Sequence, residues 1–339
     1  MQNKFDFGIK DYAKYNDLTG DLTGRIVERN HHMFDVVLEG KILRNVQAVS
    51  SLYDADIVVG DYVSVVKLDE HIFIESILQR NSVISKQSSD ASKSMKENQN
   101  EQTLAANVDQ LFILIAADQR FTLGKFERYL MSFSQDNIDM HVLISKADYT
   151  DKTVEIITDI SSTYPDIPIT PFSIYQAVTL AEVKSKIIQG RTAMFIGASG
   201  VGKSTLINLL NSSDLTTNEV RTDGKGKHTT TVTTMINMKE TGSYLIDSPG
   251  FKTISTTNDM DFDILYEPIF RLKDGCKFND CTHTHEPDCS VKLAVDEGEI
   301  SEKLYERYLI NEKKIIGQMK HETNKEKKKD RIVNKKSRG

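Results

Sequence analysis

Three patterns along the 339-residue chain predict a multidomain α/β protein. Short segments with turns between residues 18 and 86 predict a run of strands, as in a small barrel. From residue 108 on, apolar segments alternate with helical ones, which is typical of βαβ units around a mainly parallel sheet. Near the C-terminus, a segment rich in cysteine and histidine precedes one more helical pattern, and it predicts a small helical domain built around a metal ion.

The N-terminal part, residues 1–88, is expected to be a barrel preceded by a short extension. Residues 33–38 and 71–78 read as strands, and the segment contains about five such runs, which suits an OB-fold, a barrel that often binds RNA. A small barrel without an RNA role fits the same strand count. Residues 89–104 are polar, and we interpret them as a linker.

The next part, residues 105–258, is expected to form the α/β domain. Residues 108–116 (VDQLFILIA) are almost continuously apolar, as in a strand that is buried on both faces. A helix is predicted to follow, with Thr122 as its N-cap. Further strands are expected at residues 141–144, 167–170, 193–196 and 244–246.

A phosphate-binding loop is predicted directly after residues 193–196. Gly197 is followed by four residues and then by Gly202, Lys203 and Ser204, between a strand and a helix. Glycines let the backbone N–H groups surround a polyphosphate, and the helix N-terminus favours anions. Lys203 is expected to reach the β- and γ-phosphates, and the Ser204 hydroxyl to ligate Mg²⁺.

Two later segments complete the phosphate side of the site. Asp247 ends an apolar strand, where its carboxylate can hold the magnesium shell, and the N–H of Gly250 can contact a γ-phosphate. Residues 224–231 (GKGKHTTT) are in the position of a switch loop. We expect Thr230 to complete the magnesium coordination, with the threonines on either side of it as alternatives.

The base-reading element precedes the phosphate loop, although the usual order is the reverse. In Ser145-Lys146-Ala147-Asp148, the Asp148 carboxylate can accept hydrogen bonds from the N1–H and 2-amino groups of guanine, and the Lys146 stem can cover the base. The first residue is usually Asn or Thr, so the shorter Ser145 is expected to hold the phosphate loop less firmly. Residues 172–174 contain a second reader candidate. This order predicts a circularly permuted P-loop GTPase that uses GTP with Mg²⁺.

All three cysteines of the chain fall in one segment, with the spacing Cys276-x4-Cys281-x-His283-x5-Cys289. Three thiolates and one imidazole make a closed tetrahedral site for one structural Zn²⁺. Such binding contributes roughly 10–16 kcal/mol to folding of a zinc-dependent segment. His285 is the alternative fourth ligand. Residues 259–318 are therefore expected to form a helical zinc-binding domain.

Charge is unevenly distributed along the chain, whose net charge is −6. The C-terminal tail, residues 319–339, carries nine Lys/Arg and three Asp/Glu, so the rest of the chain carries −12. A basic tail on an acidic body is one form of nucleic-acid-binding arm, and a solvated disordered terminus is the alternative. No apolar run of about 18 residues and no signal peptide is visible, which predicts a cytoplasmic protein without a membrane span.

Together, residues 105–110 (AANVDQ), the permuted motifs, residues 224–231 and the cysteine cluster resemble the RsgA (YjeQ) family of small ribosomal subunit biogenesis GTPases. The resemblance extends from about residue 18 to residue 308 and implies an OB-fold, a permuted GTPase domain and a zinc domain. It implies a monomer that binds the small (30S) subunit, with its 16S rRNA and proteins, and hydrolyses GTP to GDP as a late maturation checkpoint stimulated by that subunit.

The resemblance also implies roles for particular residues, including zinc binding by Cys276, Cys281, His283 and Cys289. The implied GTP-binding residues are Ser145, Lys146, Asp148, Gly197, Ala198, Ser199, Gly200, Val201, Gly202, Lys203, Ser204 and Thr205. Many GTPases orient water with a Gln after the Asp-x-x-Gly motif, but Phe251 stands there and cannot do so. His228 in the switch loop is the candidate hydrolytic residue that is consistent with the family.

Three alternatives stay open at this point. One is an RNA-binding factor that uses nucleotide only as a switch, and another is a divergent paralogue that acts on a different RNA–protein target. A third is a P-loop kinase or ATPase, against which Asp148 argues because adenine lacks the donor pair that this carboxylate would read.

Overall fold

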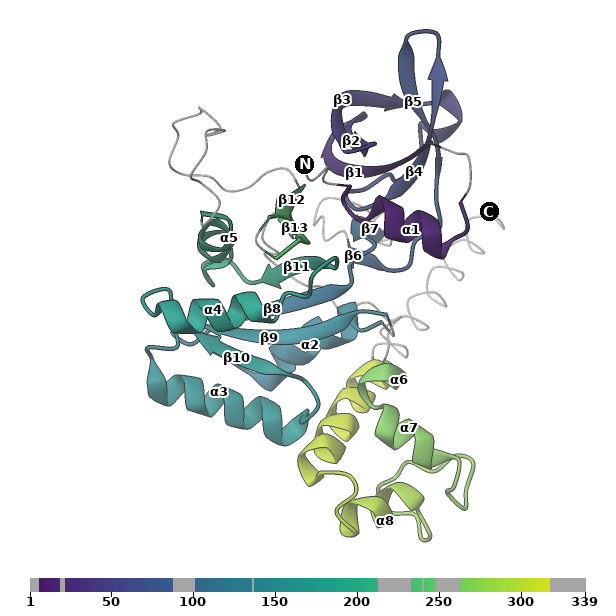
Figure 1. The fold of residues 1–339 in the computed structure, drawn as a ribbon. Coiled ribbons are helices and arrows are strands. Elements are labelled where there is room, and N and C mark those ends of the chain that lie inside the picture. The colour runs from purple at the N-terminus through teal and green to yellow at the C-terminus, as the bar shows by residue number, and fades with distance from the viewer. Residues whose placement is uncertain are drawn as a thin grey trace, which may run out of the picture.

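The computed structural model describes residues 6–18, 22–87, 101–135, 137–212, 233–239, 241–247 and 262–317. Within these ranges a barrel, an α/β domain and a helical domain follow one another along the chain (Figure 1). Several expected features lie outside the described residues: His228, Thr230, Gly250, most of the linker and the basic tail.

The N-terminal part confirms the predicted five-stranded OB-like barrel. Its strand order is β1-β2-β3-β5-β4, and β4 pairs with β1 to close the ring. The β3 and β5 strands pair in parallel, whereas the other neighbours are antiparallel. The strands are β1 (Leu22–Asn30), β2 (Met33–Leu38), β3 (Lys41–Ala48), β4 (Tyr62–Leu68) and β5 (His71–Ile77), with the short helices α1 (Ile9–Tyr15) and η1 (Ser50–Leu52) beside them.

A two-stranded sheet connects the barrel to the α/β domain. The strands β6 (Val83–Gln87) and β7 (Glu101–Ala106) are antiparallel, so residues 101–104, which were expected in the linker, belong to a strand instead. The barrel approaches this sheet closely at Gly60, which has φ +96°. A Cβ atom there would lie 2.0 Å from the Ala106 carbonyl oxygen, so only glycine fits.

The α/β domain has the strand order β10-β9-β8-β11-β13-β12. Its strands are β8 (Gln110–Ala116), β9 (Asp139–Ser145), β10 (Ile169–Phe172), β11 (Thr192–Gly197), β12 (Thr234–Met238) and β13 (Ser243–Asp247). All pair in parallel except β12, which is antiparallel to β13. The β11 strand, which leads into the phosphate loop, lies between β8 and β13 although β8, β9 and β10 precede it in the chain. This arrangement confirms the permuted order.

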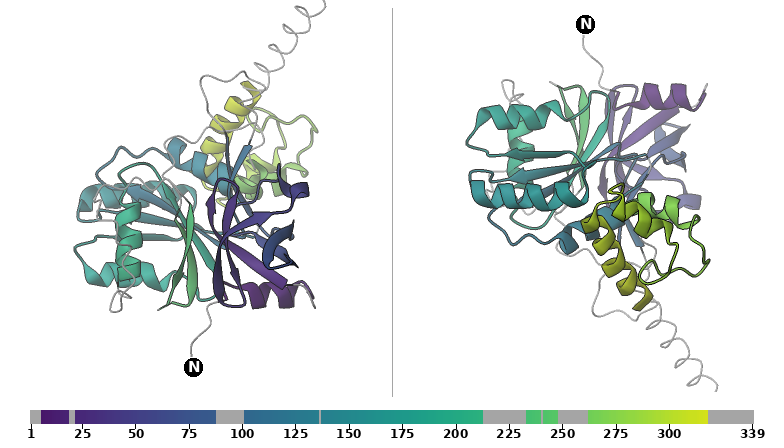
Figure 2. Two further views of the ribbon diagram at one scale, coloured as in Figure 1. Left: turned by 90° about the horizontal axis from the view of Figure 1, so that it is seen from above. Right: turned by 90° about the horizontal axis from the view of Figure 1, so that it is seen from below.

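Helices cover both faces of this sheet, as Figures 1 and 2 show. The helices are α2 (Leu123–Phe133), α3 (Thr150–Thr163), α4 (Ala177–Ser185) and α5 (Lys203–Ser212). Alternate residues of β8 face opposite sides, so that Leu111 packs in one core with α2 and α3, and Phe112 in another with α4 and α5. Both side chains are fully buried, which accounts for the continuous apolar run in the sequence.

Arg25 of β1 joins the barrel to the rest of the protein, and it is only 1% exposed. Its guanidinium donates hydrogen bonds to the carbonyl oxygens of Phe7, Gly60 and Asn107 and to the Thr192 hydroxyl. The same group lies 4.5 Å from the ring centroid of Tyr62 and 5.8 Å from that of Tyr244. The charge is therefore stabilised by oxygen acceptors and aromatic faces rather than by a carboxylate.

The C-terminal domain contains α6 (Phe262–Leu265), α7 (Glu267–Lys273), α8 (Ser290–Asp296) and a helix over residues 302–317. Ser301 caps that last helix, since its hydroxyl accepts a hydrogen bond from the Leu304 amide. The domain is anchored to α2 through Glu127, a fully buried carboxylate that binds Arg307 and Asn311 of the last helix. Among the described helices, none has both the length and the apolar character that crossing a membrane requires.

Candidate nucleotide-binding site and metal centre

The phosphate loop begins where β11 ends and leads into α5. Gly197 has φ +156°, and a Cβ atom there would lie 2.6 Å from the Leu114 carbonyl oxygen of β8. Gly200 and Gly202 also have positive φ angles, +79° and +94°. Gly197 is therefore needed for close packing on the neighbouring strand, and the backbone conformation at Gly200 and Gly202 favours glycine. Both properties suit a loop that wraps around phosphate.

Lys203 lies at the start of α5 and is only 8% exposed. Burial lowers its pKa, while the Asp247 carboxylate acts in the opposite direction. Asp247 ends β13, the strand beside β11, so the proposed magnesium-side carboxylate lies on the strand next to the one that leads into the phosphate loop and Lys203. Ser204 and Thr205 are exposed on the first turn of α5.

The base-reading segment contacts the phosphate loop through Ser145, the last residue of β9. Ser145 is 3% exposed, and its hydroxyl donates a hydrogen bond of 2.6 Å to the Val201 carbonyl oxygen. The expectation was that a serine, being short, would hold the loop less firmly. In the structure the serine does reach the loop, because β9 and β11 both flank β8 and end at the same edge of the sheet.

Asp148 is exposed beyond the end of β9, where it could meet the edge of a base. Its Oδ1 accepts a hydrogen bond of 2.9 Å from the hydroxyl of Ser173, which is 1% exposed. Ser173 was part of the second reader candidate at residues 172–174. In the structure it fixes the orientation of the Asp148 carboxylate.

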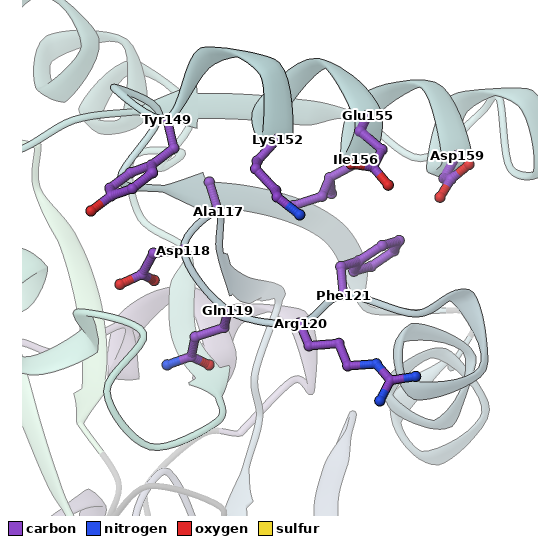
Figure 3. Close-up of a pocket in the computed structure, with 10 residues that line it drawn as sticks. All are labelled: Ala117, Asp118, Gln119, Arg120, Phe121, Tyr149, Lys152, Glu155, Ile156 and Asp159. Carbon is purple, nitrogen blue, oxygen red and sulfur yellow. The ribbon is translucent and has the colours of Figure 1, made fainter.

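A third loop, which the sequence did not single out, lies beside the other two. It follows β8, and its Asp118 binds the Lys146 ammonium while its Gln119 donates a hydrogen bond of 3.2 Å to the Ser199 carbonyl oxygen. The loop and α3 together line a cavity of about 470 Å³ (Figure 3). The sequence does contain a signal for this loop: polar residues follow a buried strand closely, at the edge of a parallel sheet where ligands bind.

The four expected metal ligands are close together in the C-terminal domain. The ligand atoms of Cys276, Cys281, His283 and Cys289 all lie within 4.8 Å of one another. The Cys276 and Cys289 sulfurs are 3.9 Å apart, and His283 Nδ1 lies 3.6 Å and 3.4 Å from them. A tetrahedron with sulfur ligands at 2.3 Å has edges of roughly 3.8 Å, so the spacing suits a single tetrahedral ion.

The chemistry of the donor set also fits a cation. Burial raises the pKa of the Cys281 thiol to about 12, and the neighbouring sulfurs of Cys276 and Cys289 act in the same direction. Three thiolates packed this closely need positive charge, which a divalent metal supplies. The alternative ligand His285 is exposed and is not a member of the cluster.

Comparison with known families gives two matches. Residues 77–257 match the family model described as RsgA GTPase. Residues 192–335 match a second model, described as 50S ribosome-binding GTPase. The first match includes the base-reading segment, the phosphate loop and Asp247.

Individual relatives agree with the first model. The chain is 34% identical over 211 residues to "Small ribosomal subunit biogenesis GTPase RsgA 2" of Vibrio parahaemolyticus, covering 61% of this chain but only 59% of that relative. It is 31% identical over 318 residues to the protein of the same name from Lactiplantibacillus plantarum, covering 90% of this chain and 87% of the relative. Among solved structures, YjeQ from Thermotoga maritima is 26% identical with a TM-score of 0.65, over 88% of this chain and 99% of that one.

Proposed function

Because the chain belongs to the RsgA GTPase family, we propose that it hydrolyses GTP to GDP and phosphate while bound to the small ribosomal subunit. The observation that carries the nucleotide part is the hydrogen bond from Ser145 to Val201. It joins a guanine-reading segment to a phosphate loop although the two occur in the reverse of the usual order. The names of the relatives support the subunit and a role in its biogenesis as a maturation checkpoint.

The site geometry supports a proposed role for each nucleotide-binding residue. Asp148 reads the guanine edge, Lys146 covers the base, and residues 197–205 bind the phosphates, with Lys203 at the β- and γ-groups. Magnesium would be held by Ser204 and Asp247 together with Thr230, and the N–H of Gly250 would contact the γ-phosphate; Thr230 and Gly250 lie outside the described residues. The ion would neutralise charge on the phosphates.

His228, also outside the described residues, is our candidate for the hydrolytic group, because Phe251 cannot orient water. We expect His228→Ala to bind GTP normally and to lose most of the turnover that the subunit stimulates. Normal turnover of this variant with subunits present would remove His228 from the mechanism.

The metal centre is proposed to hold one structural Zn²⁺ on Cys276, Cys281, His283 and Cys289. Three sulfurs and a nitrogen select zinc over the oxygen-preferring magnesium and calcium ions. Four protein ligands leave no position for a substrate, so the ion would stabilise residues 259–318 as a domain rather than take part in hydrolysis.

The remaining assignments concern the partner. The barrel, residues 1–88, and the basic tail, residues 319–339, are the proposed contacts with 16S rRNA. In the sequence they precede and follow the GTPase domain, residues 105–258, and the zinc domain. The protein would act in the cytoplasm as a monomer. The second family model mentions the 50S subunit, which makes the large subunit the necessary control.

Sedimentation with purified subunits tests the partner. The full-length protein is centrifuged with small or large subunits in the presence of a non-hydrolysable GTP analogue, GDP or ATP. We expect co-sedimentation with small subunits that is strongest with the GTP analogue and weak for Lys203→Ala. Equal binding to both subunits, or no dependence on guanine nucleotide, would overturn the proposal and favour a paralogue with another target.

A further inference from the structure

The loop between β8 and α2 contacts both nucleotide-binding loops through two consecutive residues. The Asp118 carboxylate lies 2.6 Å from the Lys146 ammonium of the base-reading segment. Next to it, the Gln119 amide donates to the carbonyl oxygen of Ser199 in the phosphate loop. The base side and the phosphate side of the site are thus joined by a third segment that belongs to neither motif.

The position of Lys146 makes the first of these contacts important. Its backbone is in the left-handed region, φ +57°, so the direction in which the side chain leaves the chain is fixed. Its ammonium is 2.6 Å from Asp118 and 3.4 Å from the Gly200 carbonyl oxygen. Both ends of the flexible lysine stem are therefore held, and the stem extends from the base-reading segment to the phosphate loop.

An ordinary surface ion pair contributes little to stability or binding. Here the two side chains are 37% and 30% exposed, so screening by solvent is partial. The larger effect of this ion pair is to restrict the conformations of the Lys146 side chain. A free lysine loses side-chain entropy when it is immobilised over a ligand. A lysine that is already held by Asp118 avoids part of that loss when the nucleotide binds.

Asp118 itself is placed by rigid elements. It follows β8, which lies inside the sheet, and precedes α2, whose Glu127 is bound to the C-terminal domain. Asp118 is therefore held at the edge of the sheet, in the loop where Figure 3 labels it beside the start of α3.

We propose that Asp118 is a positioning residue of the guanine-nucleotide site, which raises affinity for GDP and GTP by holding Lys146 in its base-covering orientation. This inference rests on the proposed function, because it presupposes that Lys146 covers a guanine base. Asp118 acts through Lys146 and does not itself read the base, so it affects affinity and not the choice among purine bases.

The test is a double-mutant cycle measured with fluorescent GDP. Asp118→Asn should weaken binding about threefold to tenfold, mainly by faster release. In the Lys146→Ala background the same change should have no further effect, since its target is gone. The preference for GTP over ITP, which lacks the 2-amino group that Asp148 reads, should stay as in the unmodified protein.

Asp56→Asn is the matched control, because it removes a comparably exposed ion pair in the barrel. In that pair Asp56 Oδ1 lies 2.9 Å from Arg29 Nη1. It should leave GDP affinity unchanged, and the thermal midpoints of all variants show whether they are folded. Unchanged affinity in Asp118→Asn, or an equal loss with and without Lys146, would overturn the inference alone. Failure of the unmodified protein to bind GDP would overturn the proposed function, and the inference with it.

Discussion

The hydroxyl of Ser145 donates a 2.6 Å hydrogen bond to the carbonyl of Val201, and 56 residues of chain separate the two. This contact connects the end of β9 to the phosphate loop between β11 and α5. Both residues are almost completely buried, at 3% and 2% exposure. The two nucleotide-binding loops are therefore joined by a buried contact that water does not weaken.

Removing this hydroxyl should weaken nucleotide binding. In Ser145→Ala the Val201 carbonyl loses its partner while it stays buried, which costs about 1–3 kcal/mol. We expect GDP affinity to fall about tenfold or more, as measured by equilibrium titration. Ser185→Ala is the control, because that exposed hydroxyl bonds to the Glu182 carbonyl oxygen of its own helix, away from both nucleotide-binding loops. The same GDP affinity in the Ser145 and Ser185 variants would contradict the role of this contact.

Loss of a metal ligand should unfold the C-terminal domain selectively. Cys289→Ser removes one of the four clustered ligands and is expected to abolish binding of the proposed zinc ion. Elemental analysis and protease sensitivity of residues 259–318 measure the effect. His285→Ala should retain one zinc per chain. Zinc loss in the His285 variant would show that the alternative ligand is the true one.

The anchor between α2 and the C-terminal domain should depend on pH. Burial by itself raises the pKa of Glu127, but hydrogen bonds from Arg307, Asn311 and Tyr164 outweigh it and hold the pKa below 4.5. Since the folded pKa is the lower one, the stabilisation is complete above pH 4.5 and is lost as the pH falls through the folded pKa.

Thermal unfolding of Glu127→Gln measures this dependence. The variant should be less stable than the unmodified protein at pH 7, and the difference should shrink as the pH falls below about 4.5. Arg307→Leu leaves the carboxylate buried without its cation and should cost about 3–5 kcal/mol at neutral pH. A stability difference for Glu127→Gln that does not change with pH would exclude the ionised carboxylate as its source.

Replacement of Arg25 should destabilise the junction between the barrel and the sheet. Arg25→Lys keeps the charge but cannot make four hydrogen bonds in different directions, so buried carbonyl groups lose their donors. We expect a loss of about 3 kcal/mol or more in unfolding free energy, measured by denaturant titration. Arg29→Lys, at an exposed ion pair, is the control and should be nearly neutral.

The parts of the fold that follow from a local pattern were predictable from the sequence. The phosphate loop after residues 193–196 can be recognised from the spacing of its glycines and lysine. The metal cluster can be recognised because all three cysteines of the chain lie in one short segment. The strand expected at residues 167–170 is found at Ile169–Phe172. Pro168 and Pro171 obscure its ends, and pairing with β9 decides its register.

Other features depend on contacts between segments distant in sequence and could not be read locally. In the sequence Arg25 cannot be told from a surface arginine, because its partners Asn107 and Thr192 are distant in the chain and meet it only in the folded protein. Asp118 follows a strand, as many loop residues do, and only the parallel pairing of β8 and β9 places it beside Lys146. The helix α1 was missed because its seven residues, IKDYAKY, are too few to show a clear helical period.

The most direct test of the central claim is the rate of GTP hydrolysis with and without isolated small ribosomal subunits, using ATP and large subunits as controls. We predict slow hydrolysis by the protein alone and strong stimulation that requires both GTP and small subunits. Tight GTP binding without stimulation, or equal stimulation by large subunits, would contradict the assignment and identify the protein as a family member that acts on a different partner.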